Sequence, residues 1–369
     1  MEGTIHVKYI PYLLSAFLIN QVTSSTSQAL NQKSETYNTD SIMLSLGKTL
    51  QNLYPIVFSE KKYKEPQSQQ QIRTDVEELI KAFKLSEKHF NQQTITYKIS
   101  YEVMLDHLKD TQNMLNNKNV LKANEMLKAI PVMCSTCHAQ DGHEKKNFLG
   151  LDRTKFDSDY SYADFCFSTR DYKNAARYYD KFLTQAGTYH SEQRTEQALI
   201  RLMTIHIQMN KDLNMAASSL NEYVKFIKES PNIKNKLQNW VKNIQNIQPK
   251  IKENYTTLKS LDYTKLEQFA QTYLLASNTS NENEKLPYYV IFRGMIYQFL
   301  NSGKKIPQEE MPFLLYWLAK CDKTTNLNDY TTHADVYLKE CYIKYPDSNW
   351  AKACKKEYDS YATLALLKY

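Results

Sequence analysis

Two cysteines and a histidine in the first half of the chain carry its clearest chemical signal. Two residues separate Cys134 from Cys137, and His138 follows at once. This CxxCH spacing is typical of the attachment site of c-type haem. Each thiol adds to one vinyl group of the porphyrin, and the adjacent imidazole then ligates the iron from one face. The motif predicts one covalent haem c, held by Cys134 and Cys137, with His138 as the proximal iron ligand.

Other uses of a CxxC pair fit the sequence less well. A structural zinc site needs a second cluster of Cys or His ligands, and none is spaced that way. A thioredoxin-like redox pair is expected in a βαβ pattern, whereas the residues around Cys134 are typical of a helix. Beyond about residue 150 the sequence shows no second CxxCH, Gly-rich phosphate loop or Ser-His-Asp set. We therefore predict a single haem and no catalytic residues in that part of the chain.

The residues before and around this motif include apolar residues at intervals of three and four, a pattern that indicates helices. These helices must position the motif. Asp40 or Ser41 is a suitable N-cap for the first of them, and a polar, proline-containing connector at 59–67 follows it. Narrow stripes of this kind are what an antiparallel four-helix bundle needs. The four stripes lie at residues 43–57, 72–90, 101–115 and 120–137.

A four-helix bundle with CxxCH near the end of its last helix resembles a class II cytochrome c, the cytochrome c′ group, over residues 38–150. A second likeness lies at 42–47 (Ile-Met-Leu-Ser-Leu-Gly), which is similar to the first helix of the low-spin branch of that family. There, a Met four residues before a Gly supplies the sixth iron ligand. The resemblance implies that Met43 is the distal iron ligand, a thioether that favours ferrous iron and raises the potential. It therefore implies a mono-haem electron carrier and not an enzyme.

Alternatives remain open at this site. Met43 lies on the apolar stripe, and flexible Met commonly fills protein cores. Without that ligand, the five-coordinate iron is open to NO, CO or peroxide, and the chain would be a gas- or peroxide-binding sensor. A third interpretation is a scaffold with structural haem. The family often follows CxxCH with an aromatic-basic pair, which is lacking here. His89 and His107 are expected to be partly exposed helix residues, not ligands.

The N-terminus has the pattern of an export signal. An apolar run at 10–19 is followed by a Ser/Thr-rich stretch, and small residues precede a cleavage point after Ala29. The run is short for a bilayer span, although an uncleaved N-terminal anchor is the alternative. We predict a signal peptide at residues 1–29, periplasmic localisation, and no membrane span after its removal.

Composition favours an all-α protein. The 369 residues include only 7 Gly and 10 Pro, so helix breakers are few. The net charge of +7 is spread along the chain. Because no Arg-rich helix or aromatic-basic platform occurs, nucleic-acid binding is not expected.

A second domain, helical and repeat-like, is predicted at residues 155–369. Residues 171–183 resemble the second helix of a tetratricopeptide repeat, in which a small residue such as Ala175 lets paired helices approach. The pattern recurs at Ala216, 41 residues later and not the usual 34, so a loose set of hairpins is expected. Such hairpins form surfaces that suit proteins. We predict that this domain is separable and docks a protein partner, the redox partner being the first choice. Further helices are expected at 234–253, 263–275, 285–300, 308–320, 330–343 and 348–367.

Four cysteines lie outside the CxxCH motif, and an even number of thiols in an oxidising compartment favours pairing. Cys341 and Cys354 flank the last interhelical turn nearly symmetrically, so antiparallel helices would bring them together. We predict this disulfide, with buried free thiols as the alternative. Cys166 and Cys321 are the remaining two.

Overall fold

The predicted stripes form long helices in the computed structural model, which describes residues 39–141, 151–185, 191–227, 230–255, 261–275, 283–325 and 333–367. Every regular element in these ranges is helical, which confirms the all-α prediction. A 3-10 turn, η1 (Arg153–Lys155), and two π-helical segments, η2 (Ile205–Met209) and η4 (Ala270–Leu275), accompany the α-helices. The α-helices are α1 (Thr39–Val57), α2 (Glu60–Tyr63), α3 (Pro66–Asn91), α4 (Ile95–Asn116), α5 (Val120–Asp141), α6 (Asp159–Ser168), α7 (Tyr172–Thr184), α8 (Glu192–Thr204), α9 (Leu213–Tyr223), α10 (Pro231–Tyr255), α11 (Tyr263–Phe269), α12 (Leu286–Leu300), α13 (Met311–Thr325), α14 (Ala334–Lys344) and α15 (Ala351–Leu367).

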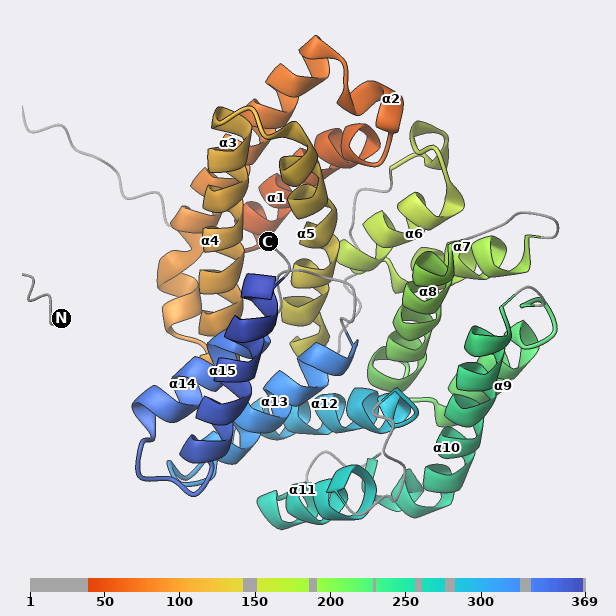
Figure 1. Ribbon diagram of the computed structural model, residues 1–369, viewed down its shortest axis with the longest axis vertical. Coiled ribbons are helices and arrows are strands. Elements are labelled where there is room, and N and C mark those ends of the chain that lie inside the picture. Colours follow the sequence, from red (N-terminus) through yellow and green to blue (C-terminus); the bar gives the residue numbers. More distant parts are fainter. Residues whose placement is uncertain are drawn as a thin grey trace, which may run out of the picture. The chain divides into compact units, whose positions relative to one another are not determined.

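Helices α1, α3, α4 and α5 form what we call the N-terminal group. Contacts join α1 to α3, α3 to α4, α4 to α5, and α5 back to α1 (Figure 1). The predicted apolar faces lie inside this group, since Leu53, Leu79, Leu108 and Leu127 are each at most 1% exposed. Burying one such side chain contributes about 1.5–3 kcal/mol. The helix faces that the apolar stripes predict to be buried are therefore buried in the structure.

The ends of the first helices differ from the prediction. Helix α1 already includes Asp40 and Ser41, the expected caps, in its first turn. The expected connector contains the short helix α2, because the Ser59 hydroxyl accepts a hydrogen bond from the Lys62 amide at its start. Pro66 then begins α3, where its missing amide hydrogen is not needed.

Helices α6 to α15 form the C-terminal group, in which chain neighbours pack as pairs: α6 with α7, α9 with α10, and α12 to α15 each with the next. Ala175 and Ala216, the small residues of the predicted hairpins, are fully buried. Helices α6 and α8 are not among the helices expected from the sequence. Helix α6 is buried on nearly all sides, so it lacks the one-sided pattern by which surface helices are recognised.

The two groups contact each other. Helix α5 packs against α6 and α12, and α4 against α14. On α1, the ring of Tyr54 meets Phe165 of α6 edge-on, with centroids 5.8 Å apart. The first helix after the predicted domain boundary is therefore a direct neighbour of the N-terminal group.

The predicted signal peptide, residues 1–29, lies outside the described residues. Among the helices that the structure describes, none combines the length and the apolar composition needed to cross a bilayer.

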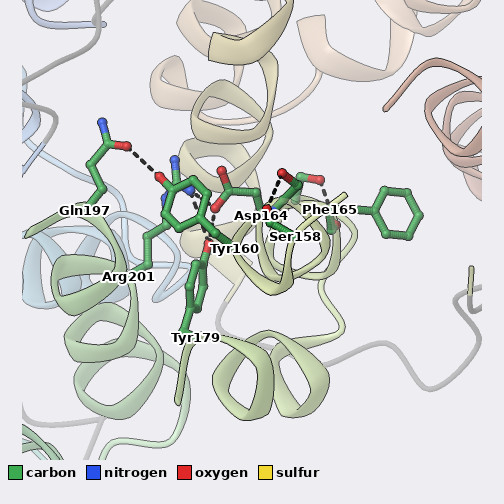
Figure 2. A network of polar contacts seen from close by, with 9 residues as sticks. Ser158, Tyr160, Asp164, Phe165, Tyr179, Gln197 and Arg201 are labelled. Carbon is green, nitrogen blue, oxygen red and sulfur yellow. Dashed lines mark hydrogen bonds and ion pairs between the residues drawn. The ribbon is translucent and has the colours of Figure 1, made fainter. Parts of the chain in front are cut away.

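A buried polar network joins α6, α7 and α8 (Figure 2). The carboxylate of Asp164 accepts hydrogen bonds from Arg201 and from the hydroxyl of Tyr179, the latter at 2.5 Å. Next to it, the Tyr160 hydroxyl donates to Gln197 at 2.7 Å. Asp164 and Arg201 are only 3% and 8% exposed, so each charge depends on the other for compensation.

A buried histidine links α4 to α5 and makes stability depend on pH. The Nε2–H of His107 donates to the carbonyl of Met126, 2.7 Å away. Burial lowers the pKa of His107, as it does for His206 and His333. His107 is thus buried, not partly exposed as expected.

We expect the free energy of unfolding to fall as the pH drops below about 6.5, the ordinary pKa of histidine. Above that pH the imidazole is neutral in both states. Below it the unfolded chain takes up protons that the folded chain resists. His107→Gln keeps an N–H donor and should flatten this fall in urea titrations between pH 7.5 and 5. An unchanged slope in His107→Gln would contradict the assignment.

Candidate functional site

The CxxCH motif lies in the last turns of α5. Cys134 and Cys137 are both half-buried and line one cavity inside the N-terminal group. His138 lies on the same helix, directly after Cys137, and its side chain is outside the described part of the structure. The helix holds the two sulfurs about one turn apart on a common side.

Met43 lies in the first turns of α1 and lines the same cavity as the two cysteines. It is half-buried, and Gly47, one turn further along, also borders the cavity without adding a side chain. The structure thus brings together three of the four residues predicted to hold haem, although Met43 precedes Cys134 by 91 positions in the chain.

An aromatic cluster packs against two residues of this site. It consists of Phe90 of α3 with Tyr97 and Tyr101 of α4, and both Met43 and Cys137 pack against it. The rings of Phe90 and Tyr101 are stacked, 5.2 Å apart and 23° from parallel. This cluster fixes the end of the N-terminal group that also carries the cysteines.

The cavity has an empty volume of about 690 Å³, part of it open to solvent. The space that it offers to the centres of water-sized molecules is about 60 Å³. Two further thioethers, Met104 and Met133, border it as well. Its remaining walls are largely aliphatic and include Leu46, Leu50, Leu79, Leu108 and Ile130.

Helix α6 and the residue after it close one wall of the cavity, through Ser168 and Thr169. Both hydroxyls donate to the carbonyl of Phe165 at 2.8 Å, so their protons are already used within the helix. No sequence signal pointed to these residues, because their place at the site depends on how α6 packs against α5.

The environment of Cys134 holds its thiol in the neutral form. Burial raises the pKa of Cys134 to about 12, well above the ordinary value for a thiol. Burial also raises the pKa of Tyr54, a fully buried residue whose surroundings include Cys134 and Ser168.

The other four cysteines lie in the C-terminal group. Cys341 of α14 and Cys354 of α15 form a disulfide, the pair expected from the sequence, with Cα atoms 6.2 Å apart. Cys166 and Cys321 are buried free thiols.

Within the described residues, no group of three or more His, Cys, Asp or Glu side chains is arranged to hold a metal ion. No family model, curated protein or solved structure matches this chain.

Proposed function

We propose that this protein is a c-type cytochrome that carries one covalent haem and transfers single electrons. The observation that carries the proposal is that Met43 and both cysteines of the CxxCH motif line one apolar cavity. They come from helices at opposite ends of the N-terminal group's sequence. Two attachment thiols and a distal thioether must lie around the same cavity in order to hold one haem.

The residues present fit such a group. Cys134 and Cys137 would tether it by thioethers, and His138 and Met43 would ligate the iron. When bound, haem supplies an iron that cycles between the ferric and ferrous states. The largely aliphatic walls lower the local dielectric, and a low dielectric together with a soft thioether ligand favours the ferrous state.

The arrangement of helices supports the class II likeness. Helices α1, α3, α4 and α5 contact one another in a closed sequence, as in a four-helix bundle whose cofactor lies between facing helices. The attachment motif falls at the end of the last of these helices, as the resemblance implies.

An oxidising compartment agrees with this function. The disulfide between Cys341 and Cys354 is of a kind that persists in secreted and periplasmic proteins. Together with the export pattern of residues 1–29, it supports the proposal that the protein works in the periplasm.

For the C-terminal group we propose docking of a protein, with the redox partner as first choice. Ala175 and Ala216 are buried where paired helices approach, which supports tetratricopeptide-like hairpins. Stacked hairpins offer extended surfaces that suit protein partners.

The test is the spin state of the iron in methionine variants of the full chain, produced with cytochrome c maturation machinery. Three methionines line the cavity, and Leu replaces Met at nearly constant volume. We expect a low-spin ferric spectrum for the wild type. Met43→Leu should turn it high-spin and open to CO, whereas Met104→Leu and Met133→Leu should leave it low-spin.

Two outcomes would contradict this assignment. A wild-type protein that is already high-spin and binds CO would favour the gas-binding alternative. Loss of the low-spin spectrum in Met104→Leu, with Met43→Leu unchanged, would move the distal ligand from α1 to α4.

A further inference from the structure

A buried hydroxyl at the cavity lacks a hydrogen-bond partner. Tyr101 is only 6% exposed and borders the cavity. Its phenolic oxygen is buried and makes no hydrogen bond in the structure. An unsatisfied buried polar atom costs about 1–3 kcal/mol, so such atoms are uncommon in folded proteins without a reason.

The ring of Tyr101 is held in place by its neighbours. It stacks on Phe90, and Phe83 lies on its flank with ring centroids 6.4 Å apart. A rotation that would bring the hydroxyl to water is opposed by this packing. The ring of Tyr101 is thus fixed within the cluster against which Met43 and Cys137 also pack.

The phenol remains a donor at physiological pH. Burial raises the pKa of Tyr101, and the negative charges of Glu87 and Glu102 raise it further. A neutral phenol at a cavity wall calls for an acceptor on the molecule that fills the cavity. Ser168 and Thr169, on another wall, donate their protons within α6 and the residue after it.

We infer that Tyr101 donates a hydrogen bond to a carboxylate of the haem and positions that edge of the cofactor. This inference rests on the proposed function. The two carboxylates are the strong hydrogen-bond acceptors at the periphery of haem, and a carboxylate accepts from a neutral phenol with a charge-assisted bond. Withdrawal of negative charge from the carboxylate favours the ferrous state over the ferric state, so the hydroxyl raises the reduction potential.

The test compares Tyr101→Phe with Tyr97→Phe in the full-length haem protein. Both variants lose one hydroxyl from the same aromatic cluster, and only Tyr101 borders the cavity. Haem retention after acid-acetone treatment is measured first, and redox titration follows. We expect both variants to keep covalent haem and a low-spin spectrum. Tyr101→Phe should lower the ferric-to-ferrous equilibrium constant about three- to tenfold, the effect of one hydrogen bond, and Tyr97→Phe should not.

The outcomes separate this inference from the proposed function. A wild-type chain without covalent haem overturns both. Haem-loaded Tyr101→Phe with the wild-type potential overturns the role of Tyr101 alone. An unchanged potential with altered CO affinity, measured in the Met43→Leu background, also overturns it, since the hydroxyl would then serve a ligand on the iron.

Discussion

Replacement of both Cys134 and Cys137 by Ala is expected to abolish covalent haem attachment. Each thioether depends on one of these thiols, and both sulfurs line the cavity. The wild-type protein, made with cytochrome c maturation machinery, should keep its haem through denaturation and acid-acetone extraction. The double variant should release all of it, and each single variant should hold haem by one bond only. Mass spectrometry of the denatured chain and a haem stain after denaturing electrophoresis measure the effect.

Cys166 and Cys321 provide the matched control. Both are free thiols, and both are more deeply buried than the motif cysteines. Burial raises the pKa of each thiol above its ordinary value, as it does for Cys134. Changing them to Ala should leave haem attachment intact. Complete extraction of haem from the wild-type chain would refute the attachment proposal.

The helices of the N-terminal group could be predicted because their packing is one-sided. Leu53 and Leu108 belong to stripes in which apolar residues recur every three or four positions, and this period indicates which face of each helix is buried. Helix α6 has no such stripe, since Tyr160 to Ser168 are all buried. A helix surrounded by protein leaves no polar face in the sequence, and its packing becomes visible only with its neighbours in place.

Only those residues of the candidate site whose type and spacing indicate a chemical role could be predicted from the sequence. Spacing identified Cys134 and Cys137, and the family likeness pointed to Met43. Tyr101 was recognised only as a member of an apolar stripe. Its unpartnered hydroxyl is a property of the packed structure, because any tyrosine in that stripe could have found a neighbouring carbonyl. The same holds for His107, whose partner is a carbonyl on the next helix.

The second large effect is expected from the buried ion pair of the C-terminal group. Asp164→Asn keeps the shape of the side chain but leaves the guanidinium of Arg201 without a counter-charge. Breaking a buried pair from one side costs about 3–5 kcal/mol of folding free energy. Asn can still accept from Tyr179, so we expect about 3 kcal/mol, measured by urea unfolding at pH 7.

Two comparisons test the cause of this loss. The pair of Arg153 and Asp159 has the same chemistry, with N and O 2.5 Å apart, but its side chains are 27% and 24% exposed. Solvent weakens such pairs to about 1 kcal/mol or less, so Asp159→Asn should cost little. Adding Arg201→Met to Asp164→Asn removes the stranded charge and should restore most of the stability. A double variant less stable than Asp164→Asn would show that the charge itself is not the cause.

The same variant measures whether the two helical groups are independent. Asp164 lies on α6, the helix whose end borders the cavity, and Phe165 contacts Tyr54 of α1. If the groups unfold together, Asp164→Asn should lower the urea midpoint equally when unfolding is followed by helix content and by the low-spin haem spectrum. If the haem spectrum persists to higher urea than the helix signal, the N-terminal group is a separable domain. Because α6 supplies a wall of the cavity, we expect the two transitions to coincide, in contrast to the separable domain expected from the sequence.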